Sequence, residues 1–135
     1  MASEVPAGFE PVKESETFEG FVGPLYERRN GADYACGFRA APHHVNGRGV
    51  VHAGMLSTFT DHTLGNLVEQ AAERPCATIS LNMDYLAGAH TGDWIECSGR
   101  VTRQTRSLVF IKGQLSVDGE LVMTASGVWK KLGAD

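Results

Sequence analysis

The sequence predicts an α+β domain in which a curled antiparallel sheet of five to six strands wraps around one long central helix. Three observations lead to this prediction. A single long stretch, from Met55 to about Ala72, has helical periodicity and no proline. The four clearest strand-like runs all follow that stretch, and only shorter ones precede it. Because one helix cannot cover both faces of a sheet, a sheet that curls around the helix satisfies the pattern.

Composition limits the number of domains and the class of partner. The chain has 135 residues, of which 42% are hydrophobic and 21% charged, as expected for one globular domain. Its formal net charge of −4 argues against a nucleic-acid binder that depends on a basic surface. No apolar run approaches a membrane span, and residues 1–11 lack the layout of a signal peptide. Three cysteines without paired spacing suit a reducing compartment, so a cytoplasmic protein is expected.

The elements before the helix are expected to be short. Residues 1–17 are rich in Glu, Ser and Pro and predict a flexible or loosely attached arm, which leaves 18–135 as the folded domain. Residues 18–26 are apolar and aromatic and predict a short strand. Asn30-Gly31 is a strong turn signal, so we expect a hairpin to a second strand over residues 34–40. Residues 42–51 then form the loop that leads to the helix.

The predicted helix has one core face. At about 100° per residue, that face collects Leu56, Phe59, Thr60, Thr63, Leu64 and Leu67. Asp61 lies on the flank of this apolar stripe, where a carboxylate can sit at the edge of a buried surface. From the helical pattern alone, a solvated aspartate is the commoner explanation.

Four strands are predicted after the helix, over residues 77–85, 93–103, 107–117 and 120–131, and we expect them to form a meander. The first alternates apolar and polar residues with a period of two. Asp118-Gly119 is a hairpin signal between the last two. A unit this small leaves sheet surface and an edge strand uncovered.

Small residues precede the helix. Gly47, Gly49, Ala53 and Gly54 let the backbone approach a ligand closely. The first N–H groups of a helix have no internal partner and lie at the positive end of its dipole. Those of Ala53 and Gly54 could therefore stabilise a carbonyl oxygen that gains negative charge, and one such donor is worth about 10²–10³ in rate. A tight turn entering a core helix would explain the same residues.

The pattern Asn46-x5-His52-Ala53-Gly54, with Asp61 nine residues after His52, resembles the signature of hotdog-fold acyl-CoA thioesterases. The most similar branch is the phenylacetyl-CoA thioesterase-like group. That signature usually reads Asn-x-x-Gly-x-x-His-Gly-Gly, followed by an aspartate on the helix.

The match has one departure. Gly49 and Gly54 agree with the signature, whereas Ala53 replaces a glycine. Family members use that residue through its backbone N–H, so the change is mild, although it leaves a methyl group close to the expected thioester. The resemblance runs from about Phe18 to the C-terminus, and it implies the hotdog fold for the whole domain.

The resemblance also implies hydrolysis of an acyl-CoA to a free acid and CoA. Asp61 would be the general base or the nucleophile, and a positioned base typically contributes about 10²–10⁴ in rate. By family analogy it would act across a subunit interface, on a thioester held by the N–H groups of Ala53 and Gly54 of the partner. A homodimer, and further a homotetramer, is therefore expected. No separate cofactor is expected, because CoA is part of the substrate.

Three further residues acquire candidate catalytic roles. Asn46 could hold the water or the thioester, because its amide donates and accepts; an Asx turn is the alternative. His52 could orient the loop or the thioester, or be a loop histidine bonded to backbone. Thr78 matches a strand position where related enzymes carry a hydroxyl that helps to place the water. An ordinary strand threonine would look the same.

Four basic residues are candidates for the phosphates of CoA. Arg103, Arg106 and Lys112 cluster around a predicted hairpin, and Arg48 lies beside the small-residue loop. A solvated hairpin tip explains the first three equally well. No metal site is expected, because the five histidines show no zinc-type spacing. Neither a Gly-x-Ser-x-Gly elbow nor a phosphate-binding P-loop is present.

Two other functions stay open from the sequence. One is a hotdog hydratase or dehydratase that acts on acyl thioesters, whose usual histidine and acid arrangement is not found here. The other is a non-catalytic module that binds acyl-CoA. The acyl group is not predicted, although Met55, Phe59, Leu64 and Tyr85 could shape its slot.

Overall fold

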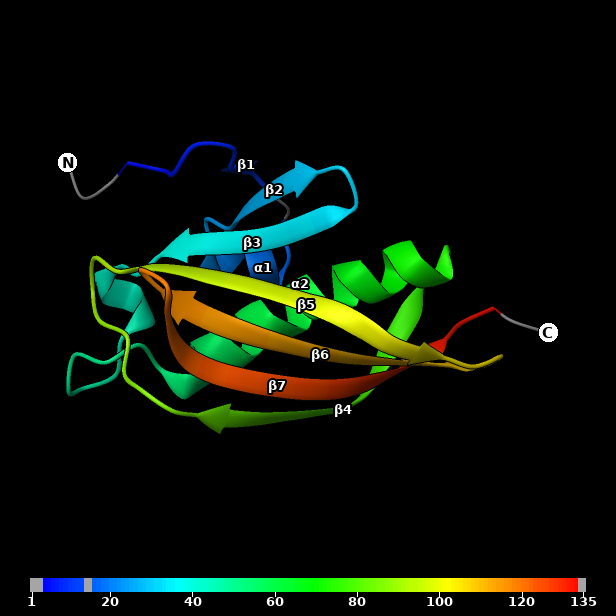
Figure 1. The fold of residues 1–135 in the computed structure, drawn as a ribbon. Coiled ribbons are helices and arrows are strands. Elements are labelled where there is room, and N and C mark those ends of the chain that lie inside the picture. Colours follow the sequence, from blue (N-terminus) through cyan, green and yellow to red (C-terminus); the bar gives the residue numbers. More distant parts are fainter. Residues whose placement is uncertain (1–3, 14–15, 134–135) are drawn as a thin grey trace.

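The computed structural model describes residues 4–13 and 16–133. Over these residues, seven antiparallel strands form one curled sheet, and one long helix lies against it (Figure 1). The strands are β1 (Glu10–Pro11), β2 (Tyr26–Asn30), β3 (Asp33–Arg39), β4 (Cys76–Tyr85), β5 (Trp94–Gln104), β6 (Leu108–Val117) and β7 (Glu120–Lys131). The helices are α1 (Phe18–Val22), the short 3-10 helix η1 (Pro42–His44) and α2 (Ala53–Ala72). The predicted α+β class, with a sheet around one long helix, is confirmed.

The strand order corrects two details of the prediction. The order is β1-β2-β3-β5-β6-β7-β4, so the sheet has seven strands rather than five or six. In addition, β4 does not continue into a meander, because it pairs with β7 at the far edge of the sheet. Tight turns join β5, β6 and β7, whereas residues 86–93 connect β4 to β5. That connection is long enough to carry the chain past the ends of β7 and β6 to the position of β5 in the same sheet.

The segment before the predicted domain packs on the sheet. Phe9 is buried and meets the Trp94 ring edge-on, with 5.2 Å between ring centroids. β1 pairs with β2, and the N–H of Val12 donates to the carbonyl of Leu25. A loosely attached arm over residues 1–17 therefore does not describe residues 9–12. Residues 1–3 and 14–15 of that predicted arm lie outside the described part of the chain.

The strand predicted over residues 18–26 is wrong. Phe18–Val22 forms α1, and the strand begins only at Tyr26. Gly23 and Pro24 separate the two elements, and a proline has no N–H to offer a sheet ladder. The following hairpin is present, but its two turn residues are 31 and 32, one position later than predicted, with Gly31 at φ +66°.

The helix α2 lies close to the centre of the sheet because two strands carry glycine there. A Cβ at Gly99 or Gly113 would come within 2.6 or 2.7 Å of a Leu64 methyl carbon. Leu64 is fully buried in the main core, with Phe59 and Val68 of the same helix. This packing fixes the rotation of α2 about its axis and so decides which residues remain at its open side.

A second contact fixes α2 from the side of β3. The hydroxyl of the buried Tyr34 donates to Glu27 Oε1 at 2.9 Å and accepts from Asn66 Nδ2 at 3.0 Å. The thiol of Cys36 also donates to it at 3.2 Å. Burial, first of all, raises the pKa of Tyr34 above its usual value, so the phenol keeps its proton. Cys36 and Cys97 are both fully buried.

Candidate active site at the amino end of the long helix

His52 caps the amino end of α2. Its Nδ1 accepts the Gly54 N–H at 2.7 Å, and its own backbone is extended. Because Nδ1 is the acceptor, a neutral His52 carries its proton on Nε2. The side chain therefore acts as the N-cap, and the Gly54 N–H, one of the two predicted oxyanion donors, is already in use.

The N–H of Ala53 remains as a donor. This N–H belongs to the peptide group between His52 and Ala53. The His52 carbonyl holds that group in place, because it accepts the N–H of Met55 at 2.9 Å and the N–H of Leu56 at 3.2 Å. Helical N–H groups point towards the amino end, so this one points out of the helix. Among the described residues it meets no acceptor, and Ala53 is exposed. The structure thus offers one backbone donor at this end of α2.

Asn46 shapes the loop before the helix. Its Oδ1 accepts the N–H groups of Arg48 at 2.8 Å and Val50 at 3.2 Å, and its backbone N–H donates to the Val50 carbonyl at 2.8 Å. Gly49 completes the turn at φ +80°. The Asx-turn alternative is thus what the structure shows, and only the Nδ2 group of Asn46 is left for a ligand.

Asp61 lies on α2 opposite the edge strand β4. Thr78 donates its hydroxyl to Asp61 Oδ1 at 2.7 Å. The sheet register is irregular between Thr78 and Ser80, so Ile79 is an extra residue on β4 and is 57% exposed. A bulge of this kind turns a neighbouring side chain, here Thr78 towards the helix. Asp61 is half-buried, and its Oδ2 is free to meet water or a substrate.

A second contact between α2 and β4 lies nearer the amino end. The Tyr85 hydroxyl lies 3.0 Å from Ser57 Oγ and donates to the Ala53 carbonyl at 3.3 Å. Ser57 also donates to that carbonyl, at 2.8 Å. Ser57 was not predicted as a site residue, although it lies one turn before Asp61 and one turn after Ala53. Only that spacing could have indicated it.

The carboxylate and the free amide are well separated in one chain. Ala53 and Asp61 are eight residues apart on one continuous helix. At a rise of roughly 1.5 Å per residue, this places them about 12 Å apart along its axis. A single thioester carbonyl therefore cannot contact both groups of the same chain.

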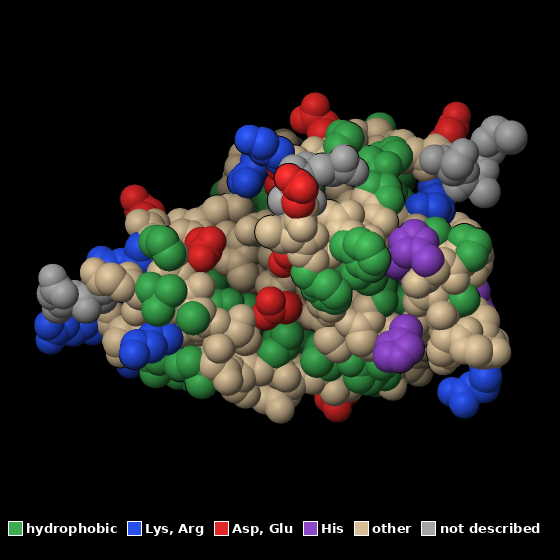
Figure 2. Space-filling model, turned by 180° about the vertical axis from the view of Figure 1, so that it is seen from behind, with side chains coloured by type: hydrophobic (Ala, Val, Ile, Leu, Met, Phe, Trp, Pro, Cys, Tyr) green, Lys and Arg blue, Asp and Glu red, His purple; other side chains and the backbone are tan. Residues whose placement is uncertain are grey.

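A cleft of about 200 Å³ opens beside the amino end of α2. It is lined by residues of α1, η1 and α2, namely Phe18, Val22, His43, His44, Val45, His52, Gly54, Met55 and Thr58. Figure 2 shows histidine and hydrophobic side chains together on this side of the molecule, behind the sheet. The predicted residues His52 and Gly54 thus share a cleft, whereas Asp61 and Thr78 lie outside it.

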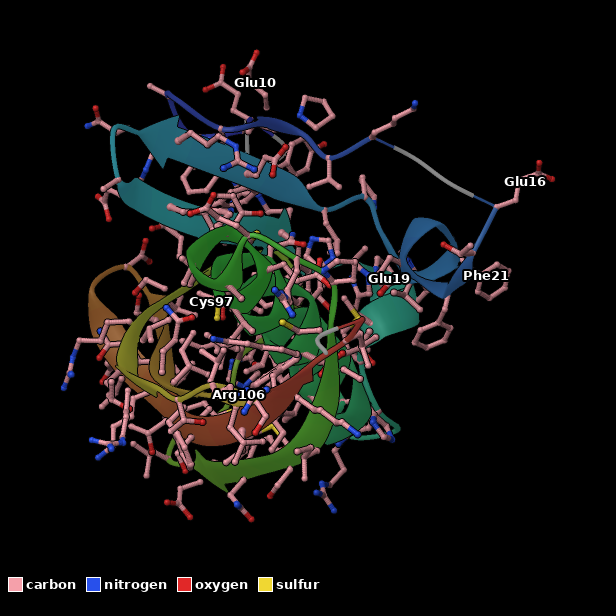
Figure 3. The ribbon with its side chains drawn as sticks, turned by 90° about the vertical axis from the view of Figure 1, so that its right-hand side faces the viewer. Glu10, Glu16, Glu19, Phe21, Cys97 and Arg106 are labelled. Atoms are coloured by element: carbon pink, nitrogen blue, oxygen red, sulfur yellow. The ribbon has the colours of Figure 1, made fainter. Side chains whose placement is uncertain are left out.

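The predicted CoA-binding residues do not gather at one place. Arg48 lies in the turn that precedes α2. Arg103 and Arg106 lie near the β5–β6 turn, where Gln104 Nε2 donates to the Ala71 carbonyl at 3.4 Å, at the opposite end of α2 (Figure 3). With 20 residues, α2 is about 30 Å long, so the two groups are far apart within one chain.

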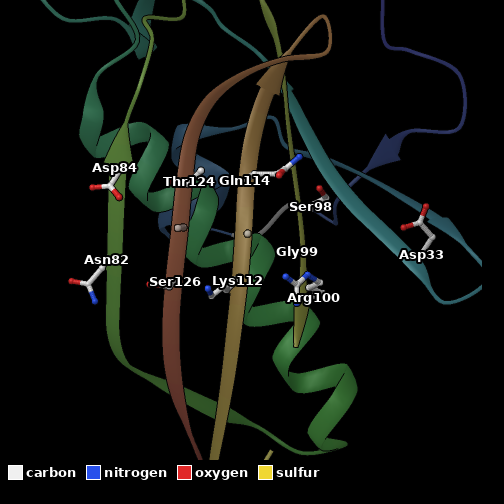
Figure 4. Close-up of a pocket in the computed structure, with 12 residues that line it drawn as sticks. Asp33, Asn82, Asp84, Ser98, Gly99, Arg100, Lys112, Gln114, Thr124 and Ser126 are labelled. Carbon is white, nitrogen blue, oxygen red and sulfur yellow. The ribbon is translucent and has the colours of Figure 1, made fainter. Parts of the chain in front are cut away.

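Lys112 occupies a different surface. It lines a shallow hollow of about 620 Å³ on the face of the sheet turned away from α2, together with Ser98, Arg100 and Gln114 (Figure 4). The sheet therefore separates Lys112 from Asp61. Within the described ranges, no group of three or more His, Cys, Asp or Glu side chains could hold a metal ion. The helices in those ranges are also too short or too polar to cross a membrane.

Comparison with known proteins identifies the family of this chain. Residues 48–124, more than half of the chain, match the thioesterase superfamily. A Pseudomonas aeruginosa protein that is provisionally named an esterase is 32% identical over 128 residues, which are 93% of this chain and 96% of that protein.

Two solved structures show the same architecture. A phenylacetic acid degradation-related protein of Ralstonia eutropha is 27% identical, with a TM-score of 0.74 over 83% of this chain and 87% of its own. A hypothetical thioesterase of Streptococcus pneumoniae, solved with coenzyme A, is 17% identical, with a TM-score of 0.75 over 93% of this chain and 97% of its own. The resemblance to hotdog-fold thioesterases is confirmed: the chain belongs to the thioesterase superfamily, and among solved structures it is similar to the phenylacetic acid degradation-related protein.

Proposed function

We propose that the protein is an acyl-CoA thioesterase in which Asp61 is the catalytic acid–base or nucleophilic group. The observation that carries the proposal is the half-buried carboxylate of Asp61, held by Thr78 beside an open edge strand. Membership of the thioesterase superfamily supports a hydrolase. The relative from Streptococcus pneumoniae was solved with coenzyme A, which favours a CoA thioester as the substrate.

The proposed reaction needs two groups from this fold. The N–H of Ala53 donates to the thioester oxygen and stabilises the negative charge that it gains. As a base, Asp61 takes a proton from water while the water oxygen attacks the carbonyl carbon. The C–S bond then breaks, the acid is released, and CoA leaves as a thiol after taking up a proton. As a nucleophile, Asp61 would instead form an anhydride that water hydrolyses.

The separation of these groups within one chain supports a homodimer. Because Ala53 and Asp61 are about 12 Å apart along α2, one carbonyl can meet both only if they come from two copies. The strand β4 offers the surface for such a contact, since its outer edge has no neighbour in the described sheet. Ile79, Tyr85 and Leu86 are large apolar residues exposed on or next to it.

The register of that edge is consistent with a shared site. Consider a two-fold axis between Leu81 and Asn82, with β4 paired antiparallel to its own copy. Three residues separate Thr78 from the axis and three separate Tyr85 from it. The bulge at Ile79 shifts the register by one residue, so Thr78 and Tyr85 of the second copy would lie within one residue of each other. Thr78 contacts Asp61, and Tyr85 contacts the Ala53 carbonyl. The axis would therefore bring Asp61 to Ala53 of the second copy.

The same arrangement gives the basic residues a role. The two α2 helices would run antiparallel, so the carboxyl end of one helix, near which Arg103 and Arg106 lie, would extend beyond the amino end of the other. There these arginines, with Arg48 of the second copy, could meet the phosphates of CoA. Lys112 is left out of this site. Pairing of two such dimers into the predicted homotetramer would use a surface other than β4.

The test is hydrolysis of a panel of acyl-CoAs by the wild type and by Asp61→Asn, with release of free thiol as the readout. We expect a loss of at least about 10²-fold in kcat. Asp84→Asn, an exposed carboxylate on the outer face of β4, is the matched control and should retain full activity. Full activity of Asp61→Asn would overturn the mechanism. Tight acyl-CoA binding without turnover in the wild type would favour the binding module instead.

A further inference from the structure

The short helix α1 forms one wall of the cleft beside the amino end of α2. Phe18 and Val22 lie one turn apart on α1, and both line the cleft. Phe18 is nevertheless 59% exposed, so its ring stands at the solvent side of the cleft. Phe21 of the same helix is 85% exposed, does not line the cleft, and points away from the molecule in Figure 3.

The α1 wall is fixed relative to the helix cap. His44 Nε2 donates to the Val22 carbonyl at 2.6 Å, and His43 Nε2 lies 3.3 Å from the Gly23 carbonyl. The His44 carbonyl in turn accepts the N–H of His52 at 2.9 Å. Hydrogen bonds therefore connect the carboxyl end of α1, through η1, to the residue that caps α2. The distance from this wall to the Ala53 N–H is set by the fold.

The cleft has both polar and apolar lining. His43, His44, His52 and Thr58 supply the polar side chains, and Phe18, Val22, Val45 and Met55 supply the apolar ones. Its volume of about 200 Å³ is somewhat larger than the roughly 150 Å³ of an apolar cavity that takes up benzene in another protein. A group the size of one ring, or a short alkyl chain, fits such a space.

We infer that this cleft is the acyl slot and that Phe18 closes its outer end, so that Phe18 sets the largest acyl group that the enzyme accepts. The inference rests on the proposed function, because it takes the Ala53 N–H as the place of the thioester oxygen. The acyl chain then runs from the amino end of α2 past Met55 and ends against Phe18. Phe18 is a specificity-determining residue that contacts the end of the substrate remote from the reaction.

The test compares kcat/KM for straight-chain acyl-CoAs from two to sixteen carbons in Phe18→Ala, Phe18→Trp and the wild type. Phe18→Ala should move the optimum to longer chains and Phe18→Trp to shorter ones. Each methylene that gains or loses a buried place changes kcat/KM about fourfold. Loosening of α1 would not move the optimum in opposite directions for the two variants. Phe21→Ala, on the same helix but outside the cleft, should keep the wild-type optimum.

A binding measurement separates failure of this inference from failure of the proposed function. In an Asp61→Asn background, calorimetry gives the Kd of each acyl-CoA without hydrolysis. The chain length of tightest binding should shift with Phe18→Ala and Phe18→Trp as the kinetic optimum does. If thioesters are hydrolysed but neither profile moves, the acyl slot lies elsewhere and the inference is overturned. If no thioester is hydrolysed, the proposed function fails, and the binding profile alone supports or overturns the role of Phe18.

Discussion

The hydroxyl of Thr78 donates a 2.7 Å hydrogen bond to Asp61 Oδ1, and this contact joins the edge strand β4 to the middle of α2. Because Asp61 accepts this hydrogen bond through Oδ1, its carboxylate is held in one orientation, with Oδ2 directed away from Thr78. The bulge next to Thr78 makes the contact possible, because it turns this side chain towards the helix. The edge strand thus positions the proposed catalytic group besides offering a surface for a second copy.

Replacing Thr78 tests this positioning. Thr78→Val keeps the shape of the side chain and removes the donor, and we expect kcat to fall about tenfold, the size of one hydrogen bond to a charged group. Thr78→Ser keeps a hydroxyl and should stay within a few-fold of the wild type. Thr78 is exposed, so the free energy of unfolding of each variant, measured by thermal unfolding, should differ from that of the wild type by less than about 0.5 kcal/mol. Equal kcat in the valine and serine variants would show that the hydroxyl plays no part.

The close approach of α2 to the sheet predicts a stability change. A Cβ at Gly99 would lie 2.6 Å from a Leu64 methyl and 2.8 Å from the Lys112 carbonyl oxygen. Gly99→Ala should therefore destabilise the fold by about 1–3 kcal/mol, as overpacking of a core does, measured by urea unfolding. Gly47→Ala is the control, since a Cβ there meets nothing within 4 Å. A neutral Gly99→Ala would mean that the helix can shift without cost.

The sequence predicts the elements with a strong period and misses those that depend on long-range pairing. The long helix and the four later strands appear within two residues of their predicted bounds, because each has a clear hydrophobic repeat. The position of β4 beside β7 depends on the route of the 86–93 connection, which carries no periodic signal. The apolar run at Phe18 was interpreted as a strand because a five-residue helix is too short to show a period.

The candidate site follows a similar division. The motif places His52, Ala53 and Gly54 at a helix start, and the structure agrees. The motif does not show that the His52 ring accepts a hydrogen bond from the Gly54 N–H, because that bond depends on the rotamer of His52. Asn46 is followed by backbone N–H donors that its side-chain oxygen can accept in an Asx turn, and it does so. The separation of Lys112 from Asp61 depends on which face of the sheet each strand residue takes, and one bulge changes that alternation.

The buried His44 and the half-buried His62 lead us to expect that the stability of the fold decreases in acid. Burial, as the largest cause, lowers the pKa of both His44 and His62 below 6.5. As the pH falls through about 6.5, these histidines take up protons in the unfolded chain before they do so in the folded one. The free energy of unfolding therefore keeps its full value above that pH and decreases below it. Urea unfolding between pH 7.5 and 5 should show this slope. His44→Gln and His62→Gln should each reduce it, and an unchanged slope in the double variant would contradict the assignment.

The N–H of Ala53 can be removed without disturbing the helix. Ala53 is the first residue of α2, where proline is well tolerated, and His52 has the extended backbone, φ −61° and ψ 135°, that a following proline requires. Ala53→Pro should therefore keep the wild-type unfolding temperature. Its kcat should fall about 10²–10³-fold, as for loss of one oxyanion donor. Ala53→Ser, which retains the N–H, is the control. Full activity in the proline variant would exclude this N–H as the donor.

Mixing two inactive variants tests whether each site is shared between copies. In a dimer of one Ala53→Pro chain and one Asp61→Asn chain, one site carries both changes and the other carries neither. Random exchange makes half of the dimers mixed, with one intact site in two, so about a quarter of the wild-type activity should return. A mixture of Asp61→Asn with Asp61→Ala should regain nothing, because every site then lacks the carboxylate. If the first mixture stays inactive although subunit exchange is demonstrated by native mass spectrometry, Ala53 and Asp61 do not serve one thioester across the interface, and the 12 Å separation along α2 would leave the site without its proposed pair.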